Sequence, residues 1–522
     1  MILKIKFEFS EQINGFIFMK KQESKVVVIG GCGTVGSLMA RVLKDNGADV
    51  TVSDLSTDSP QVKILKKEGI NLNLGGHDEN VLKDADIVVV APSLLENHNL
   101  IEKIRKVTNV DIISVDEVLS LCKVNKPVVG ITGTNGKTTT TWMLKNILNL
   151  SGYKTPEHKL DMQGNTELIP SFQARLAGDV AVLEIGTFGN PNEIKNCSTK
   201  SEVSIGIITN ISKDHLNESR KFRDYVECKR EIVDAVKFLA FNADDPVVSG
   251  FNTDNSHEIL FYGIENVNLE VEAYPEVRKC PLCGKELEYS VHYLGHLGIY
   301  NCSCGFSRPE PDVKAADVDN NSFKLVIGSN TAKIKLKQNG IHNVYNALAA
   351  ACGSIALDID FDDIVNGIKN FEGVKGRFQE INIGKRVIID YAHNPAGVKA
   401  IVQTLNREKP ENSRLIVVNT ISSESGIKGD IEIAKILKDV DTIIVASNAS
   451  RTALSEINVN SNVILTESSK NGSKIGTLGA SKAQVEESLN LAIGEAKKRD
   501  IILVIGEGGV KYSAEILEKY KS

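Results

Sequence analysis

Short β-branched runs alternate with helical segments along most of this chain. In the N-terminal part, KVVVIGG (25–31) and ADVTVSD (48–54) have the apolar pattern of buried strands, and the segment between them places its apolar residues at helical spacing. ADIVVVAPS (85–93) and VDIISVDE (110–117) continue the alternation. Strands that alternate with helices predict a doubly wound α/β unit with a parallel sheet.

Two further units show the same alternation. One begins at Pro127 with a strand, a glycine-rich loop and a helix, and the other begins after GVKGRF (373–378). We therefore predict an α/β fold of three doubly wound, Rossmann-like domains. The expected boundaries are 19–123 for the N-terminal domain, 124–372 for the central domain and 373–522 for the C-terminal domain, with a cysteine-bearing insertion at 277–312 in the central domain.

Length and composition agree with this division. A chain of 522 residues is too long for one domain. The net charge of −6 argues against a nucleic-acid-binding protein held by phosphate contacts, and no apolar stretch is long enough for a membrane span. The nine cysteines suit a reducing cytoplasm better than a disulfide framework. Residues 1–18 do not have the pattern of a signal peptide, and we expect them to be upstream coding sequence or a dispensable strand.

The loop after the first strand of the central unit has the composition of a phosphate-binding loop. Backbone N–H groups of a glycine-rich turn, together with the N-terminus of the following helix, can hold phosphates. The lysine would reach the β- and γ-phosphates of ATP, and the threonine after it would bind Mg²⁺. A plain glycine-rich turn is the alternative, but it leaves the lysine without a role. The predicted ATP-binding residues are Gly133, Thr134, Asn135, Gly136, Lys137, Thr138 and Thr139.

A second glycine pattern lies in the N-terminal unit. Gly31, Gly33 and Gly36 follow a strand, and Asp54 ends the next strand. This pattern by itself favours NAD or FAD, because an acidic residue at that place can hold a ribose hydroxyl, but it also admits another nucleotide such as a UDP group. The alternative is close packing of helix on strand without a ligand.

Several further motifs occur in a fixed order along the second and third units. They are TGTNGKTTT (132–140), TNISKDHL (209–216), NADDP (242–246), HNVYNALAA (342–350), Gly376-Arg377 and DYAHNP (390–395). Together they resemble the Mur ligases, and the N-terminal unit resembles the UDP-binding domain of that family. The likeness therefore covers nearly the whole chain, and an ordered set of motifs is far more specific than any one of them.

The resemblance implies a reaction. ATP would phosphorylate a substrate carboxylate to an acyl phosphate, and the amine of a free amino acid would attack it, giving an amide, ADP and phosphate. The acceptor would be a UDP-linked amino acid or peptide. A carboxylate is a poor electrophile, and bringing anions together requires metal ions and cationic side chains.

The resemblance also implies roles for particular residues. Lys137 would hold the phosphates, and Thr138 and Glu184 would bind one Mg²⁺. His215 would bind a second metal ion. Lys229 matches a lysine that is carbamylated in many of these enzymes, and as a carbamate its oxygens could bind metal. The alternative for Lys229 is a solvated helix lysine.

On the nucleoside side, Asn343 and Asn346 would face adenine, while Arg377 and Asp390 would serve the phosphates and ribose from across the gap between two domains. His393 is equally consistent with a structural role in its turn. Two segments depart from the family pattern: Glu184 is followed by Ile-Gly-Thr in place of two serines, and IGEGGVKYS (505–513) stands where a GKGHE-type segment is expected. These departures concern the amino-acid pocket and leave the ATP chemistry intact.

The insertion in the central unit contains two pairs of cysteines. Cys280 and Cys283 form one knuckle, and Cys302 and Cys304 form a second, shorter one. Four thiolates would complete a closed, structural zinc site, and free cysteines in a loop are the alternative. Because a ribbon of this kind is a separate insertion, we expect Cys283→Ser to destabilise it and to leave ATP binding largely intact.

The insertion also resembles the zinc ribbon of the Mur-ligase-like subunit of bacterial isoglutaminyl synthase. That reading is an alternative function, an amidating ligase that works with a glutaminase partner, but such chains lack an N-terminal UDP-binding domain. A three-domain ligase with this ribbon is similar to the archaeal ligases proposed to assemble the pseudomurein peptide. A folylpolyglutamate-synthase-like activity, a regulatory protein without turnover and a dehydrogenase explain fewer of the motifs.

The amino-acid substrate is the least constrained part of the prediction. Ser447-Asn448-Ala449-Ser450-Arg451 follows a strand where diaminopimelate-adding ligases carry a serine–aspartate–asparagine–proline–arginine stretch, and only the serine and the arginine match. Arg451 could bind a carboxylate of the amino acid with a bidentate pair, and a surface arginine is the alternative. The resemblance to pseudomurein ligases implies lysine, alanine or glutamate in place of diaminopimelate, and the lost asparagine–proline fits such a changed pocket. We therefore expect lysine first, and alanine or glutamate second.

Overall fold

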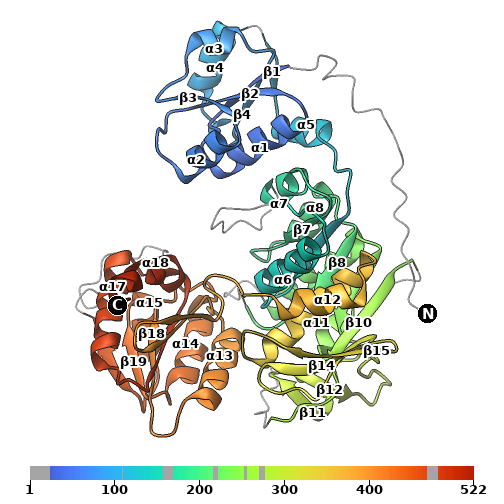
Figure 1. The fold of residues 1–522 in the computed structure, drawn as a ribbon, viewed down its shortest axis with the longest axis vertical. Helices are drawn as coiled ribbons and strands as arrows, with labels where there is room; N and C mark the ends of the chain where they lie inside the picture. Colours follow the sequence, from blue (N-terminus) through green and yellow to red (C-terminus); the bar gives the residue numbers. More distant parts are fainter. Residues whose placement is uncertain are drawn as a thin grey trace.

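Three large sheets, one in each domain, and a small two-stranded sheet in the insertion organise the chain in this computed structural model (Figure 1). The structure describes residues 24–108, 110–156, 168–214, 221–251, 256–269, 277–466 and 480–521. The predicted α/β class with doubly wound, parallel-sheet domains is confirmed. Residues 1–18 lie outside the described part. None of the helices in the described part of the chain combines the length and apolar character of a membrane span.

The N-terminal domain has a parallel five-stranded sheet in the order β3-β2-β1-β4-β5. The order reverses direction between β1 and β4, and such a switch point is where open α/β sheets bind ligands. Its elements are β1 (Lys25–Ile29), α1 (Thr34–Asp45), β2 (Asp49–Asp54), α2 (Pro60–Lys67), β3 (Asn71–Leu74), α3 (Glu79–Lys83), β4 (Ile87–Val90), η1 (Pro92–Leu94), α4 (His98–Val107), β5 (Ile112–Ile113) and α5 (Val115–Leu121).

The central domain has an eight-stranded sheet in the order β15-β14-β13-β10-β9-β8-β6-β7, in which only the β13–β14 and β14–β15 pairs are antiparallel. Its first elements are β6 (Val128–Thr132), α6 (Lys137–Leu150), α7 (Leu168–Gln173), β7 (Ala181–Glu184), α8 (Glu193–Lys200), β8 (Ile205–Ile208), α9 (Phe222–Arg230), η2 (Val233–Ala235), β9 (Phe238–Asn242), α10 (Pro246–Ser249) and β10 (Glu258–Ile264). The remainder are β11 (Glu288–Leu294), β12 (Leu297–Asn301), β13 (Val313–Ala316), β14 (Ser322–Ile327), β15 (Asn330–Lys335), α11 (Ile341–Ala356) and α12 (Phe361–Lys369).

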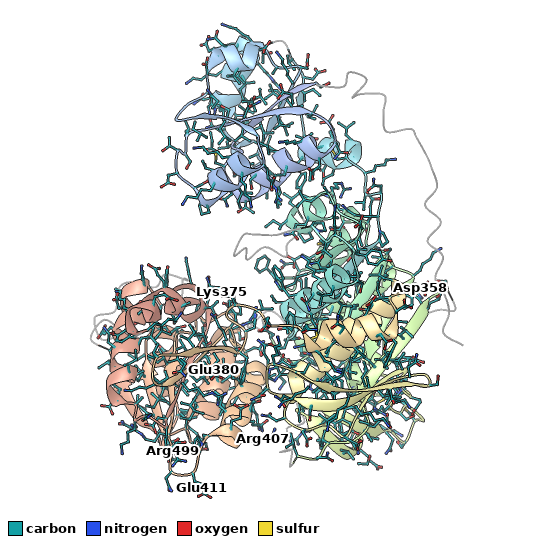
Figure 2. All side chains as sticks on the ribbon, viewed as in Figure 1. Asp358, Lys375, Glu380, Arg407, Glu411 and Arg499 are labelled. Atoms are coloured by element: carbon teal, nitrogen blue, oxygen red, sulfur yellow. The ribbon has the colours of Figure 1, made fainter. Side chains whose placement is uncertain are left out.

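The C-terminal domain has a six-stranded sheet in the order β16-β17-β21-β18-β19-β20, parallel except for the β16–β17 pair. Figure 2 shows Lys375 where the chain passes into this domain. Its elements are β16 (Gln379–Asn382), β17 (Arg386–Asp390), α13 (Pro395–Glu408), β18 (Leu415–Asn419), α14 (Gly426–Leu437), β19 (Thr442–Val445), α15 (Asn448–Ser455), β20 (Asn462–Leu465), α17 (Lys482–Glu495), β21 (Ile501–Ile505), α18 (Glu507–Leu517) and η3 (Glu518–Tyr520).

Burial on both faces explains why the central strands are continuously apolar. All five residues of β6 and all four of β8 are buried, as expected for parallel strands covered by helices on each side. One apolar cluster packs α6, α11 and α12 on one face, and a second packs α8 and α9 on the other. The carboxyl ends of β6, β7, β8 and β9 therefore meet at one edge, which brings Glu184 together with three of the sequence motifs, 132–140, 209–216 and 242–246.

Candidate active site

The glycine-rich loop connects the end of β6 to the first residue of α6, as the sequence predicts. Gly133 and Gly136 have φ angles of +135° and +87°, a region that side chains other than glycine rarely adopt. A Cβ atom at Gly133 would also overlap Thr209, and one at Gly136 would overlap Asn346. These glycines let the loop lie against its neighbours while it presents the N-terminus of α6.

The segment after β8 supports this loop. Asn210 accepts a hydrogen bond from the backbone N–H of Thr134 through its carbonyl, at 2.8 Å. The Thr209 hydroxyl and the Asn210 amide both donate to the carbonyl of Asn135, at 2.7 and 2.9 Å. The supporting segment, residues 209–214, therefore fixes the height and direction of the phosphate loop.

Oxygen ligands and cations meet at the start of α6. The Thr138 hydroxyl donates to a carboxylate oxygen of Glu184, which ends β7, at 2.7 Å. Arg377 reaches across from the C-terminal domain, and its Nη2 donates to the same hydroxyl at 3.2 Å. The Lys137 ammonium donates to the Thr134 carbonyl at 2.8 Å, and burial lowers the pKa of Lys137 against the opposing charge of Glu184. A hydroxyl and a carboxylate in contact are the oxygen donors that Mg²⁺ prefers.

Lys229, near the end of α9, is buried and is not the solvated lysine of the alternative reading. Its side chain is 1% exposed, its Nζ lies 3.5 Å from the Thr132 hydroxyl, and it stands 5.3 Å from the centre of the Tyr225 ring. Burial, with the charge of Lys137, lowers the pKa of Lys229 to about 7. The neutral amine is therefore populated near neutrality. His215, the predicted ligand of a second metal ion, lies outside the described residues.

The two asparagines of α11 lie beside the phosphate loop. Asn346 donates to the side-chain oxygen of Asn343 at 3.2 Å, and it accepts from the Thr140 hydroxyl at 3.3 Å. Both asparagines are buried. Thr139 is also buried, on the first turn of α6. The structure thus brings the predicted adenine-facing residues next to the predicted phosphate-binding residues.

Across the gap between the domains, the DYAHNP motif meets the phosphate loop. The Asn394 amide donates to Asn135 Oδ1 at 3.0 Å and receives a bond from Asn135 Nδ2 at 3.2 Å. Asn394 also donates to Asp214 at 3.2 Å, and the Ser425 hydroxyl donates to the other oxygen of Asp214 at 2.7 Å. We did not assign these roles from the sequence, although Asn394 and Asp214 lie within two of the quoted motifs.

Asp390 and His393 hold this turn together. The two Asp390 oxygens accept from the backbone N–H groups of Phe378 and Ala392, both at 2.7 Å. The His393 side chain is 15% exposed, with Nδ1 3.1 Å from the Tyr391 carbonyl and Nε2 3.6 Å from Asp214. Burial lowers the pKa of His393, but its partner Asp214 and the nearby Glu424 raise it above its ordinary value overall.

The N-terminal glycines have different surroundings. A Cβ atom at Gly31 would lie 2.7 Å from Val52, and one at Gly36 would overlap the backbone of Gly30. Gly33 is open, with the nearest atom to such a Cβ at 3.6 Å. Asp54 accepts from the backbone N–H of Cys32 at 2.8 Å. Two of the three glycines therefore serve close packing, and Gly33 leaves space before the N-terminus of α1.

The four cysteines of the insertion converge. Their sulfur atoms all lie within 4.8 Å of one another, with Cys280 and Cys304 3.7 Å apart and Cys283 and Cys302 3.5 Å apart. Zn–S bonds of about 2.3 Å in a tetrahedron place sulfur atoms about 3.8 Å apart. A glycine with positive φ follows each knuckle, Gly284 at +74° and Gly305 at +93°. The shorter second knuckle therefore still closes, and the cluster is compatible with a bound metal ion.

Arg451 lies on α15, whose first turn is capped by Ser447. The Ser447 hydroxyl donates to the Ile421 carbonyl at 2.7 Å, just beyond the end of β18. The SNASR stretch therefore sits at the carboxyl edge of the C-terminal sheet. The role of Arg451 in binding the amino acid stays a prediction.

Comparison with known proteins agrees with this geometry. Residues 24–114 match the MurD-like N-terminal domain of Mur ligases, 131–307 match the Mur ligase middle domain, and 376–508 match the Mur ligase glutamate ligase domain. The structure of a pseudomurein peptide ligase type C from Methanothermus fervidus is 55% identical, with a TM-score of 0.87, and the match covers 96% of this chain and 100% of that one. The chain belongs to the Mur ligase family.

Mur ligases are ATP-dependent amide ligases that use Mg²⁺, and this chain is an ATP-dependent acid–amino-acid ligase. A UDP-N-acetylmuramate–L-alanine ligase of Aquifex aeolicus is 27% identical over 498 residues, which is 94% of this chain and 96% of the relative. A Thermotoga maritima MurC structure, 19% identical with a TM-score of 0.58 and covering 95% of this chain and 99% of that one, shares the fold. The dehydrogenase reading is thereby removed, and a glutaminase partner has no support.

Proposed function

We propose that this Mur ligase adds an amino acid to a UDP-linked amino acid or peptide during synthesis of the pseudomurein cell-wall peptide. The observation that carries the proposal is the 55% identity, over the full length of that chain, to the pseudomurein peptide ligase of Methanothermus fervidus. The site supports it, because the phosphate loop, the oxygen donors and the cations needed to activate a carboxylate lie together at one sheet edge.

ADP release tests this proposal. The protein is assayed with ATP, Mg²⁺ and a panel of UDP-linked acceptors, each with and without a series of free amino acids. We expect turnover that requires both an acceptor and an amino acid. Turnover that accepts ammonia in place of the amino acid would favour the amidating alternative. ATP hydrolysis that no carboxylate acceptor stimulates would contradict ligation itself.

For the phosphoryl transfer, we propose that Lys137 and Arg377 neutralise the phosphates while Thr138 and Glu184 hold Mg²⁺. The ion, when bound, supplies charge stabilisation to the transferred phosphoryl group. The 2.7 Å contact between Thr138 and Glu184 places two suitable oxygens at one point. Asn343 and Asn346 would face adenine and Asp390 the ribose, and His215 would bind a second metal ion.

We propose that Lys229 is carbamylated. Its neutral amine would attack carbon dioxide, forming an N–C bond and releasing a proton, and the resulting carbamate oxygens would bind metal. Burial and the pKa of about 7 support the step, because only the unprotonated amine is a nucleophile. Carbamylation adds the mass of carbon dioxide, about 44 Da. The mass of the intact protein should therefore be higher by that amount when it is measured under gentle conditions with bicarbonate than when it is measured without.

In the N-terminal domain, we propose a UDP site formed by the loop of Gly31, Gly33 and Gly36 together with Asp54. The open space at Gly33, before the N-terminus of α1, supports approach of a diphosphate. Titration calorimetry with UDP and with NADH distinguishes the two ligands. Tight binding of NADH without binding of UDP would overturn this assignment.

We propose one structural zinc ion per chain, held by Cys280, Cys283, Cys302 and Cys304. The sulfur spacing supports this proposal. None of the nine cysteines, all within the described residues, forms a disulfide, which suits a reducing compartment such as the cytoplasm. Elemental analysis of chelator-washed protein should find about one zinc per chain, the stoichiometry of one closed site. Protein that is folded and metal-free after the wash would contradict the site.

For the amino acid, we propose that Arg451 binds a carboxylate of the incoming substrate, with lysine tested first and alanine or glutamate next. Several relatives of about 27% identity are named as L-alanine ligases, which adds weight to testing alanine early. Arg451→Ala should raise the Michaelis constant for the accepted amino acid about tenfold, roughly the cost of losing one charged hydrogen bond. An unchanged constant for every accepted amino acid removes Arg451 from the pocket.

We also propose the domain division 19–123, 124–372 and 373–522, with the insertion at 277–312. The separate sheets support it. Limited proteolysis followed by mass spectrometry should give first cuts near residues 123 and 373, because domain boundaries lie in exposed linkers.

A further inference from the structure

The four-cysteine insertion is not a separate appendage of the central domain. Its hairpin, β11 and β12, has the cysteines at one end and a turn containing His296 at the other. Tyr293 and Leu297, on either side of that turn, belong to the apolar cluster beneath α6 and α11. The N–H of Gly298 donates to the carbonyl of Asp244 at 2.9 Å. The turn of the hairpin is therefore anchored in the central domain.

The two aspartates of the NADDP motif each have a side-chain partner from this insertion. Arg308 Nε donates to Asp244 Oδ1 at 2.6 Å, and its Nη2 donates to the Ile264 carbonyl at 2.9 Å. Asp244 is fully buried and Arg308 nearly so. A buried carboxylate without such a partner would be strongly destabilising. The arginine of the insertion thus fixes the charge and direction of Asp244.

Asp244 passes this constraint to the adenine side of the site. Its other oxygen accepts from the Tyr345 hydroxyl at 2.7 Å and from the N–H of Ile264 at 2.8 Å. Tyr345 lies on α11 between Asn343 and Asn346, the two residues proposed to face adenine. The path from Arg308 through Asp244 to Tyr345 therefore holds the first turns of α11.

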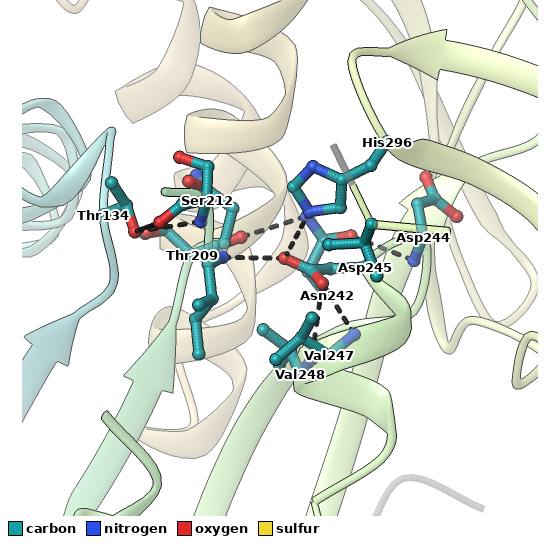
Figure 3. A network of polar contacts seen from close by, with 12 residues as sticks. Thr134, Thr209, Ser212, Asn242, Asp244, Asp245, Val247, Val248 and His296 are labelled. Carbon is teal, nitrogen blue, oxygen red and sulfur yellow. Dashed lines mark hydrogen bonds and ion pairs between the residues drawn. The ribbon is translucent and has the colours of Figure 1, made fainter. Parts of the chain in front are cut away.

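Asp245 passes a second constraint to the phosphate side. His296 Nε2 lies 3.3 Å from Asp245 Oδ2, and both side chains are buried. The same oxygen accepts from the N–H of Ile211 at 2.7 Å. Figure 3 shows the His296 ring facing Asp245. Ile211 belongs to the supporting segment, which holds the phosphate loop through Thr209 and Asn210.

We propose that Arg308 and His296 are positioning residues of the nucleotide site, through which the cysteine insertion holds the adenine-facing helix and the phosphate loop in register. This inference rests on the proposed function, because it assumes that ATP binds between α6 and α11. The His296 path starts from the turn of the hairpin and the Arg308 path from the segment after it, whose N–H donates to the Tyr300 carbonyl of β12 at 3.0 Å. The two paths end on opposite sides of the same site. A shift of the insertion would therefore misplace the base and the phosphates together, and small misplacements are costly in catalysis.

The test uses full-length protein and three substitutions. Arg308→Lys and His296→Gln keep polar groups at their positions, and Tyr345→Phe removes one hydrogen bond while the Arg308–Asp244 pair stays intact. Matched controls come from the same insertion: His292→Gln, a histidine that stacks on Tyr289, and Arg278→Lys, an exposed arginine.

Three measurements separate positioning from general destabilisation. They are the dissociation constant of a non-hydrolysable ATP analogue, the Michaelis constants for ATP and for the UDP-linked acceptor, and the thermal midpoint. We expect His296→Gln and Tyr345→Phe each to weaken binding of the analogue by about tenfold and to raise the Michaelis constant for ATP by a similar factor. Their Michaelis constant for the acceptor should stay near the wild-type value. Both control variants should resemble wild type in all three measurements.

The outcomes are distinguishable. Folded Tyr345→Phe and His296→Gln proteins that bind the analogue as wild type does would overturn the inference, even if Arg308→Lys fails to fold. Equal rises in the constants for ATP and acceptor, or similar losses in the controls, would indicate general loosening and would also overturn it. Failure of wild-type protein to bind the ATP analogue would instead contradict the proposed function.

Discussion

The two glycine loops of this Mur ligase look alike in sequence but differ in what their glycines do. In the central loop, Gly133 and Gly136 have positive φ angles and lie against polar groups that hold the loop in place. In the N-terminal loop, Gly31 and Gly36 are required because Val52 and the backbone of Gly30 leave no space for a side chain. A glycine motif therefore indicates a ligand only when its surroundings are known.

The largest expected effect is in the central loop. Lys137→Ala should lower ADP release at least about a hundredfold, because one cation that neutralises developing charge is lost. Lys145→Met is the matched control, since Lys145 is also buried on α6, where burial lowers its pKa to about 7. Steady-state ADP release measures both variants. If Lys137→Ala loses no more activity than Lys145→Met, the glycines of the central loop serve packing alone, as Gly31 and Gly36 do in the N-terminal loop.

Lys229→Ala should reduce turnover by about tenfold to a hundredfold, the usual cost of losing a group that organises a metal site. Because only the neutral amine reacts with carbon dioxide, wild-type activity in carbon-dioxide-depleted buffer should fall as pH drops below about 7, where Lys229 is protonated. Bicarbonate should partly restore it. Arg230→Ala, one residue further along α9, serves as control, and a Lys229→Ala enzyme with wild-type rates would refute carbamylation.

In the N-terminal loop, we expect substitution of a packed glycine to lower stability more than it lowers ligand affinity. Gly36→Ala forces a methyl group onto the backbone of Gly30, and we expect it to lower the free energy of unfolding of the N-terminal domain by about 3 kcal/mol, the upper end for overpacking. Urea unfolding monitored by circular dichroism measures this loss. Unchanged stability would mean that the helix can move away, and that packing does not explain this glycine.

Gly33→Ala should have the smallest effect on stability, in contrast to Gly36→Ala in the same loop. Its Cβ would meet nothing closer than 3.6 Å, so the free energy of unfolding should change by no more than about 0.5 kcal/mol. The added methyl would face the space proposed for a diphosphate, and UDP affinity should fall by about threefold or more, through lost contact with the backbone. Calorimetric titration with UDP decides this, and an unchanged affinity would place the diphosphate elsewhere.

Local pattern was sufficient for much of this molecule. Alternating strands and helices predict the three doubly wound sheets, and the GTNGKT loop and the four cysteines are found where their spacing places them. These features depend on residues close together in the sequence. The burial of Lys229 follows from how α9 packs, and a pattern of polar residues around a lysine does not distinguish this from a solvated helix face.

The expectation that the cysteine insertion is independent of the rest of the central domain was wrong. The structure contradicts a separate ribbon, because Arg308 binds Asp244 across 64 positions and His296 lies against Asp245. For this reason Cys283→Ser is expected to weaken ATP binding as well as the ribbon. Hydrogen-bond partners this far apart depend on the tertiary packing of a hairpin turn and leave no periodic signal. The contacts of Asn394 with Asn135 and Asp214 were missed for the same reason.

The reciprocal amide pair between Asn135 and Asn394 has a consequence for how the protein is made. The two residues are 259 positions apart, and ribosomes add about 5 to 20 residues per second. The phosphate loop therefore leaves the ribosome about 13 to 52 s before the residue that joins it from the C-terminal domain. Asp244 also leaves the ribosome before Arg308, so its carboxylate cannot be buried against its partner until residue 308 has emerged. Nascent chains stopped before residue 308 should consequently be more sensitive to protease than those stopped after the central sheet is complete.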